Sequence, residues 1–208
     1  MRANLYYFCS MLKSYFHKNL LEAGCDEAGR GCLAGPVFAA AVILPPQVRL
    51  PLLNDSKKLS SDVRNLLRKQ IEEKALAWAV ASCSEREIEK HNILNCSILA
   101  MQRAVQQLSI RPEHLLIAGN RFKPFDFFSY TTIIKGDGKY KSIAAASILA
   151  KTHRDEYMIN LSKKHPEYDF DKHKGYGTKK HVQVIHKLGY LDCHRKTFQL
   201  KNSKSGSR

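Results

Sequence analysis

The chain has 208 residues, of which 44% are hydrophobic and 25% charged, values that are ordinary for a soluble globular protein. They predict a single domain and exclude wholesale disorder, collagen-like repeats and coiled coils. With 34 Lys and Arg residues against 19 Asp and Glu, the formal net charge is +15. Because such a charge repels itself in a compact fold, it indicates a polyanionic partner.

The N-terminal part predicts two strands after an undefined start. Residues 1–20 carry no capping or strand signal, and we expect an extension of uncertain order. Apolar and β-branched residues cluster at 21–26 and again at 37–44, which predicts two strands. The Gly-rich stretch 29–35 between them predicts a hairpin connection. At the other end of the chain, residues 201–208 are expected to form a mobile basic tail.

Two helices and a strand are predicted next. Ser60 or Ser61 can cap a helix whose apolar residues recur with helical spacing at Val63, Leu66, Leu67 and Ile71. Residues 75–81 form an apolar run that predicts a strand. From Leu94 to Leu108 apolar residues follow in steps of four, three, four and three, which predicts a second helix.

The remaining elements set the fold class. Short apolar runs at 115–117 and 131–134 predict strands, and the Pro- and Gly-free segment 142–164 predicts a long helix. The small residues at 144–147 suit close packing of that helix. Residues 178–188 predict a last helix with a Thr cap. Together the elements predict an α/β fold over 21–200, with a mixed sheet flanked by helices and a helical C-terminal part.

Cysteine usage indicates the compartment. The six cysteines show no Cys-x-x-Cys pair and no zinc-binding spacing: Cys9, Cys25, Cys32, Cys83, Cys96 and Cys193. A chain of this length can build a core without disulfides, so we expect free thiols in a reducing cytoplasm. No segment before Cys25 has the apolar run of about 7 to 15 residues that export requires. No run approaches the roughly 20 apolar residues of a membrane span, so we expect no membrane association.

Positive charge is concentrated in the C-terminal third. From Lys135 to Arg208 there are 17 basic residues against 7 acidic ones, together with six of the nine His residues. Basic residues mixed with aromatic rings suit a nucleic-acid surface, where Lys and Arg contact phosphates and rings pack on sugars or bases. The alternative is a solvated basic face on an ordinary protein. We interpret the His residues as basic or packing groups rather than zinc ligands.

Two adjacent carboxylates, Asp26 and Glu27, follow the first predicted strand. Adjacent side chains of a regular strand point to opposite faces, so both could serve one site only if the strand ends or bulges between them, which Gly29 would allow. Carboxylate oxygens are ligands that Mg²⁺ and Mn²⁺ prefer. The alternative is a solvated acidic pair. A chain with a charge of +15 has little need of an isolated acidic pair, which favours the metal interpretation.

Six motifs follow one another along the chain. They are Asp-Glu-Ala-Gly-Arg-Gly at 26–31, Leu-Ala-Gly-Pro-Val at 33–37, Asp-Ser-Lys-Lys-Leu-Ser at 55–60, Lys-Gly-Asp at 135–137, Ser-Ile-Ala-Ala-Ala-Ser-Ile-Leu-Ala-Lys-Thr at 142–152 with Arg154-Asp155, and His-Lys-Gly-Tyr-Gly-Thr at 173–178. In this order and spacing the chain resembles ribonuclease HII from about Leu21 to Phe198. The sister family ribonuclease HIII typically carries an extra N-terminal domain, which residues 1–20 are too short to supply.

The resemblance implies a ribonuclease H-like fold and a monomeric endonuclease. Its expected substrates are RNA/DNA hybrids and duplex DNA with embedded ribonucleotides, cut 5′ to the ribonucleotide to leave 5′-phosphate and 3′-hydroxyl ends. Four carboxylates would hold two Mn²⁺ or Mg²⁺ ions, and carried over to this chain they fall on Asp26, Glu27, position 118 and Asp137. Of these, Asp26, Glu27 and Asp137 are the expected catalytic carboxylates.

Position 118 departs from the family pattern. Where relatives read Leu-Ile-Asp-Gly-Asn, residues 116–120 read Leu-Ile-Ala-Gly-Asn, so Ala118 replaces one metal ligand. Two-metal phosphoryl transfer depends on such ligands, and we expect the chain to be severely impaired. Three explanations stay open: a deliberate inactivating substitution, a natural loss, or compensation by Asp126 or Asp155. The alternative function is a protein that binds RNA/DNA hybrids without cutting them.

Other residues are expected to select the substrate. The resemblance implies that the backbone of Gly29, Arg30 and Gly31 reads the ribonucleotide's 2′-hydroxyl, the group that separates RNA from DNA. It also implies that Tyr176 lies against the sugar beside the cut. Its flanking Gly residues indicate an exposed loop rather than a core position. Candidate phosphate contacts are Lys57, Lys58, Lys139, Lys174, Lys179, Lys180 and Arg195.

Overall fold

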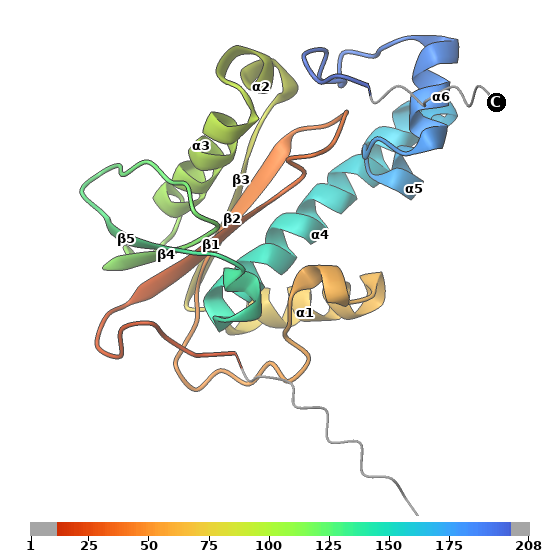
Figure 1. Cartoon of the computed structure of the whole chain (residues 1–208). Coiled ribbons are helices and arrows are strands. Elements are labelled where there is room, and N and C mark those ends of the chain that lie inside the picture. The colour runs from red at the N-terminus through yellow and green to blue at the C-terminus, as the bar shows by residue number, and fades with distance from the viewer. Residues whose placement is uncertain (1–11, 201–208) are drawn as a thin grey trace, which may run out of the picture.

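The computed structural model describes residues 12–200, which fold around a five-stranded sheet (Figure 1). Its strands are β1 (Glu22–Ala28), β2 (Val37–Ile43), β3 (Ala77–Cys83), β4 (His114–Ala118) and β5 (Ser129–Ile133). They are arranged in the order β3–β2–β1–β4–β5. β1, β2 and β3 form an antiparallel meander, whereas β1, β4 and β5 run parallel. The sheet is therefore mixed, as predicted.

Helices cover both faces of the sheet. They are α1 (Ser61–Lys74), α2 (Glu85–His91), α3 (Ile93–Gln106), α4 (Lys141–Lys164), α5 (Phe170–His173) and α6 (Lys179–Leu188), with short 3₁₀ turns η1 (Ser56–Lys58), η2 (Gly136–Gly138) and η3 (Pro166–Tyr168). α4 packs on β1 and β2 beside α1, and α3 covers the opposite face (Figure 1). β2 is apolar at every position because both of its faces are covered. β1 is apolar in its middle and carries the acidic residues Glu22, Asp26 and Glu27 toward its two ends.

The N-terminal part of α4 lies directly against β1. Its residues Ala144, Ala145 and Ala146 are fully buried, and they bring the helix backbone close to Gly24 of β1. A Cβ atom at Gly24 would lie 2.2 Å from the carbonyl carbon of Ser142. The small residues predicted to allow close packing of this helix therefore serve that purpose.

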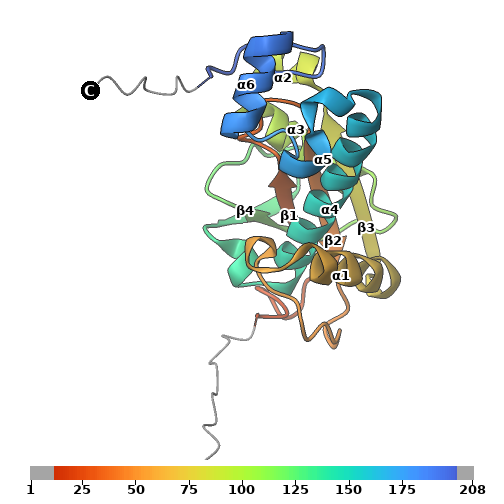
Figure 2. The same cartoon turned by 90° about the vertical axis from the view of Figure 1, so that its right-hand side faces the viewer.

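The C-terminal part packs at the far end of α4. α5 and α6 lie there, while α1 lies at the other end (Figure 2). Tyr168, Phe170 and Ile185 form a small core with Met158 of α4. Backbone hydrogen bonds join this part to the loop 29–35, since Leu33 donates to the Gly175 carbonyl and Gly35 donates to the Cys193 carbonyl, both at 2.8 Å. The loop that follows β1 is thus fixed by residues that come much later in the chain.

The expected extension is partly attached to the domain. Lys13 donates to the Lys139 carbonyl at 2.8 Å, and Glu22 accepts from the backbone N–H groups of Phe16 and His17. Residues 1–11 and the predicted tail 201–208 lie outside the described residues. The cysteines in the described part are free, and Cys9 lies outside it. Within residues 12–200, no helix combines the length and apolar character needed to cross a membrane.

Candidate active site

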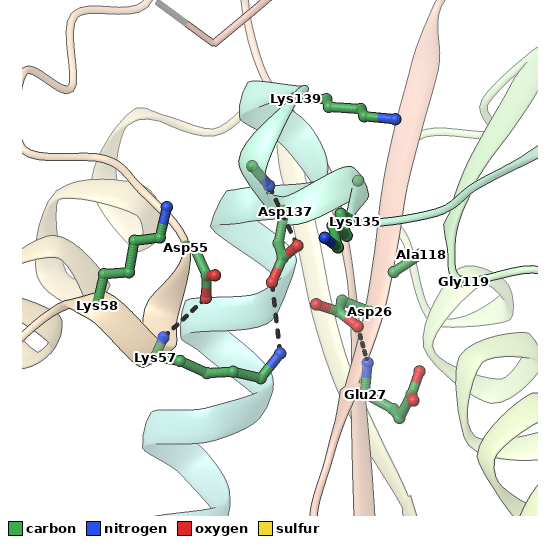
Figure 3. A pocket seen from close by; sticks show the side chains of 12 residues that line it. Asp26, Glu27, Asp55, Lys57, Lys58, Ala118, Gly119, Lys135, Asp137 and Lys139 are labelled. Carbon is green, nitrogen blue, oxygen red and sulfur yellow. Dashed lines mark hydrogen bonds and ion pairs between the residues drawn. The ribbon is translucent and has the colours of Figure 1, made fainter. Parts of the chain in front are cut away.

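The predicted carboxylates gather at one end of the sheet. Asp26 and Glu27 lie near the end of β1, Ala118 ends β4, and Asp137 lies in η2 just before α4. Cys25 pairs with Ile117 across the parallel strands, so the next residues, Asp26 and Ala118, are neighbours. All four positions line one pocket of about 620 Å³ (Figure 3). Residues more than 100 positions apart therefore meet where two parallel strands end.

Asp26 and Glu27 reach this pocket without a bulge. Regular pairing with β2 continues through both residues to Ala28, so the two acids line one pocket without the bulge or strand end that a shared site was expected to need. Their side chains consequently point in different directions, with Asp26 toward Asp137 and Glu27 away from it (Figure 3). Glu27 instead pairs with Arg30, whose Nη1 lies 3.2 Å from its Oε1. Glu27 lies at the rim of the pocket, and Asp26 and Asp137 lie inside it.

The site crowds negative charge into a buried place. Burial, followed by the charges of Glu27 and Asp137, raises the pKa of Asp26 well above its usual range. Burial also raises the pKa of Glu27, and Arg30 opposes this shift. Lys57 Nζ lies 3.6 Å from Asp137 Oδ2 and supplies one positive charge. Three further lysines line the pocket at Lys58, Lys135 and Lys139. The carboxylates are thus placed where a cation is favoured.

The carboxylates of this pocket are suitable ligands for a divalent cation, but few of them converge on one point. Carboxylate oxygens are the ligands that Mg²⁺ and Mn²⁺ prefer. Among residues 12–200, however, no three Asp, Glu, His or Cys side chains lie close enough together to hold one ion. Ala118 presents a methyl group beside Asp26, and Glu27 is turned toward Arg30. In the described residues, the site therefore has side chains of the right chemistry, but fewer than three of them converge on one point.

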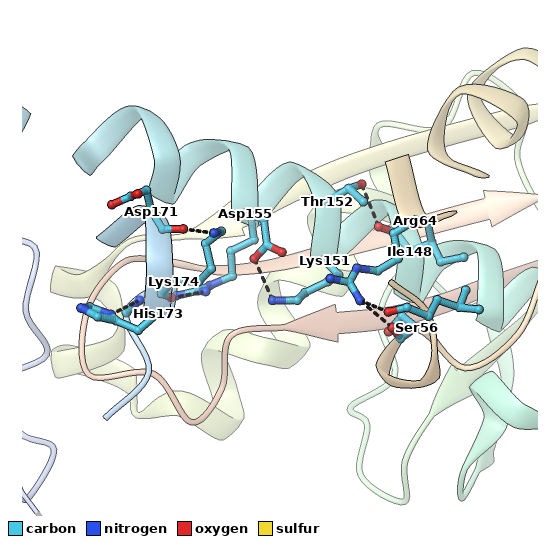
Figure 4. A network of polar contacts seen from close by, with 12 residues as sticks. Ser56, Arg64, Ile148, Lys151, Thr152, Asp155, Asp171, His173 and Lys174 are labelled. Atoms are coloured by element: carbon cyan, nitrogen blue, oxygen red, sulfur yellow. Dashed lines mark hydrogen bonds and ion pairs between the residues drawn. The ribbon is translucent and has the colours of Figure 1, made fainter. Parts of the chain in front are cut away.

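Asp126 and Asp155, the two acids expected as possible substitutes for an Asp at position 118, do not line this pocket. Asp155 pairs with Lys151 at 2.7 Å on α4 (Figure 4), and Asp126 accepts from Gln106 Nε2 at 3.1 Å. The pocket is lined instead by Asp55, whose Oδ1 accepts from the backbone N–H of Lys57 at 2.9 Å. Asp55 belongs to the motif at 55–60 and was not predicted as a site residue. Asp55 caps the N-terminus of η1, and an Asp at the start of a short turn is the feature of the sequence that could have indicated a fixed side chain here.

The expected recognition residues adjoin the carboxylates. Gly29, Gly31, Lys57 and Tyr176 line a second pocket of about 280 Å³ that shares Asp26 and Glu27 with the first. The Tyr176 residue is 41% exposed, so it lies at the surface, as its flanking glycines indicate. Gly29 has a φ of +95°, and a Cβ atom there would lie 2.0 Å from Arg154 Nε. Glycine is required at this position by both backbone conformation and space.

Two buried arginines hold the loop between these residues. Arg154 donates to the carbonyls of Ala34, Pro36 and Lys174 at 2.8 to 3.1 Å. Arg195 donates to the carbonyls of Gly35 and Arg30 at 2.7 to 3.0 Å. Arg195 is only 1% exposed, so its predicted role as a phosphate contact is wrong. Its guanidinium instead satisfies buried carbonyls of the loop 29–35.

The lysines among the predicted phosphate contacts fall in different places, and Lys179 and Lys180 lie at the start of α6. Lys57, Lys58 and Lys139 line the first pocket, and Lys174 lines a further one on α1 and α4. Lys180 pairs with Asp169. Three of these side chains therefore surround the carboxylates.

A family model and the most similar curated proteins point to the same family. A family model described as ribonuclease HII matches residues 23–201. A ribonuclease HII of Phocaeicola vulgatus is 60% identical over 190 residues, covering 91% of this chain and 94% of that protein. A second, from Bacteroides thetaiotaomicron, is also 60% identical and covers 91% and 95%.

Solved structures share the fold. The ribonuclease H2 of Pyrococcus horikoshii superposes with a TM-score of 0.73 at 23% identity, covering 86% of this chain and 94% of that one. A Bst ribonuclease HIII in complex with Mn²⁺ gives a TM-score of 0.63 at 18% identity, covering 85% and 66%. These likenesses confirm the expected ribonuclease H-like fold. Because the family model and the close relatives extend over nearly its whole length, the chain belongs to the ribonuclease HII family of endoribonucleases.

Proposed function

We propose that the chain recognises RNA/DNA hybrids and single ribonucleotides in duplex DNA, and that its hydrolytic site cuts 5′ to the ribonucleotide. The observation that carries this proposal is the shared border of two pockets, one lined by Asp26, Glu27 and Asp137, the other by Gly29 and Tyr176. The names of the close relatives support the reaction class. Free thiols in the described part support the cytoplasm as the place of action, and we propose a monomer.

Asp26, Glu27 and Asp137 are the proposed metal ligands. When bound, Mn²⁺ or Mg²⁺ would supply an activated water and countercharge for the leaving 3′ oxygen. The Mn²⁺ complex of a structural neighbour supports this choice of ion. Asp26 and Asp137 are buried and keep their oxygens directed into the pocket, while Lys57 beside Asp137 is exposed and can reach a phosphate. Because Ala118 removes a ligand, we propose that the chain cuts slowly as it stands.

Substrate selection is assigned to the loop 29–31 and to Tyr176. Gly31 has open space where a side chain would be, so the backbone there can approach the sugar of a bound strand closely. The ring of Tyr176 lies 5.5 Å from Lys151 Nζ, which places a cation beside the flat surface offered to the sugar. A hydroxyl on that sugar would distinguish RNA from DNA.

A second candidate is binding without cleavage. Ala118 and the shortage of converging metal ligands favour it, while the recognition residues are complete. The two candidates share one binding surface and differ in the chemical step. Both predict that the chain prefers a duplex with one ribonucleotide over the same duplex made only of DNA.

We expect this preference to depend on Tyr176. The chain should bind a duplex with one ribonucleotide on the order of tenfold more tightly than all-DNA. Tyr176→Ala should remove most of this difference, because it removes the ring and hydroxyl proposed to lie against the ribonucleotide's sugar. Fluorescence anisotropy with labelled duplexes measures both affinities, and gel analysis after Mn²⁺ addition locates any cut.

Tyr15→Ala is the matched control, because Tyr15 is similarly exposed, at 43%, but lines neither pocket. Equal affinity of the parent for both duplexes, with no cut at the ribonucleotide, would refute the proposed function. Cleavage by the parent at a slow rate favours the nuclease, and tight binding with no product favours the second candidate.

A further inference from the structure

The backbone on both sides of the Tyr176 ring is held by imidazole groups. His173 Nδ1 accepts from the N–H of Gly175 at 3.1 Å. His181 Nδ1 lies 2.9 Å from the carbonyl oxygen of Tyr176 itself. The loop that presents the ring is therefore fixed by side chains from α5 and α6, which take no part in the carboxylate pocket.

The hydrogen bonds fix the proton positions in a chain of two histidines. A carbonyl oxygen only accepts, so His181 carries its proton on Nδ1 and its Nε2 is an acceptor in the neutral ring. His194 Nε2 lies 3.1 Å away and must donate to it. The Nδ1 of His194 then accepts, and the N–H of Leu191 reaches it at 2.8 Å. That nitrogen also lies 3.3 Å from the Leu191 carbonyl, which already accepts from the His194 N–H at 3.0 Å.

A third histidine completes the arrangement. His173 stacks on His181 with ring centroids 4.2 Å apart and an interplanar angle of 17°. Its Nε2 lies 2.7 Å from the Tyr168 carbonyl and must donate, which leaves Nδ1 as the acceptor for Gly175. All ring nitrogens of His173, His181 and His194 are thus used, each in one role.

Burial keeps these rings neutral. His181 is fully buried and His194 is 1% exposed, and burial lowers the pKa of each to about 4. Phe170 packs against both rings. A proton added to His194 Nδ1 would point at the N–H of Leu191, which already donates to that nitrogen. This hydrogen bond therefore requires the uncharged imidazole of His194.

We propose that His181, His194 and His173 are positioning residues for Tyr176. Their uncharged rings form a hydrogen-bond network, here called the relay although no proton moves along it, which holds the loop on which ribonucleotide recognition depends. This inference rests on the proposed function. The backbone of His194 forms an isolated antiparallel β-bridge with Ala34, and that of Tyr176 forms one with Cys32. The relay therefore connects the Tyr176 loop to the loop 29–35. The two recognition loops share this anchor, and its geometry sets their spacing.

The test compares variants that remove or keep the donor to Tyr176. Affinities are measured for duplexes with and without one ribonucleotide. His181→Leu removes the donor, and His181→Asn places an amide nitrogen near the position of Nδ1. His114→Leu is the matched control, since His114 is also buried with two hydrogen bonds but lies at the opposite end of β4. Thermal unfolding confirms that each variant is folded.

We expect His181→Leu to reduce the preference for the ribonucleotide by on the order of tenfold, the whole preference proposed for Tyr176, because the ring is no longer held against the sugar. Affinity for all-DNA should change less than about twofold, and His181→Asn should retain most of the preference. An unchanged preference in folded His181→Leu overturns the relay. The relay is also overturned if His181→Asn or His114→Leu loses as much of the preference for the ribonucleotide as His181→Leu does. A parent without any preference refutes the proposed function instead, which is a separate result.

A second measurement does not depend on the variants. Nitrogen-15 NMR of the parent reports which imidazole nitrogens carry protons. The relay requires protons on Nδ1 of His181 and on Nε2 of His194 and His173. A proton on Nε2 of His181, or a charged ring at neutral pH, would contradict it even if His181→Leu failed to fold.

Discussion

Ala118→Asp is expected to raise the rate of cleavage 5′ to a single ribonucleotide by at least about 10- to 100-fold, the range typical of weaker changes around a metal site. The new carboxylate would extend from the end of β4 beside Asp26, into the pocket that Asp137 faces. It would supply the oxygen that the converging ligands lack. Single-turnover rates with Mn²⁺ or Mg²⁺ measure the effect, and calorimetric titration with Mn²⁺ measures the accompanying gain in metal affinity.

Two variants test whether the charge of the new side chain is responsible. Ala118→Asn has nearly the same shape without the charge and should recover little activity. Adding Asp26→Asn to Ala118→Asp should abolish the gain, because Asp26 lies inside the same pocket. If Ala118→Asp binds Mn²⁺ no better and cuts no faster than the parent, the proposed ligand set is wrong. Equal gains from Asp and Asn would show that charge plays no part.

Gly24→Ala is expected to destabilise the fold by about 1–3 kcal/mol or more, as overpacking in a tight core does. The added Cβ atom would lie 2.2 Å from the Ser142 carbonyl carbon and 2.3 Å from the Ile143 nitrogen, both of which are backbone atoms that no rotamer change can move. α4 would have to shift away from β1, and η2 with Asp137 directly precedes that helix. Urea denaturation followed by circular dichroism gives the free energy of unfolding.

Gly138→Ala provides the control for Gly24→Ala. A Cβ atom at Gly138 meets no atom within 4 Å, and its φ is not positive, so its free energy of unfolding should change by less than about 0.5 kcal/mol. Equal stability of Gly24→Ala and the parent would show that α4 can retreat from the sheet without loss.

Long elements could be predicted from sequence because each has a strong local pattern. The segment 142–164 lacks Pro and Gly and becomes α4, and the spacing from Leu94 to Leu108 becomes most of α3. β3 begins two residues later than predicted, because the N–H of Ala75 still bonds to Ile71 of α1. α2 was not predicted, although Ser84 and Glu87 form a capping box that signals its start.

The site was less predictable because its geometry comes from distant parts of the chain. That Asp137 meets Asp26 could be expected only from the family resemblance, since nothing local at 135–137 specifies where η2 lies. A bulge after Asp26 was the condition for both acids to share a site, but β2 pairs with β1 through both acids and they share the pocket without one. Arg195 could not be distinguished from an exposed cation, since the carbonyls that bind it belong to Arg30 and Gly35.

The buried arginines beneath the loop 29–35 change how this surface should respond to ionic strength. Arg154 and Arg195 are sealed from solvent, and the hydrogen bonds of their guanidinium groups go to backbone carbonyls. Exposed lysines such as Lys57 gain affinity for a phosphate strand by releasing counterions, and lose it as salt rises. The field of a buried guanidinium group passes partly through protein, where salt screens it less than it screens an exposed lysine. Part of the attraction for a bound strand should therefore persist at salt concentrations that screen the exposed lysines such as Lys57.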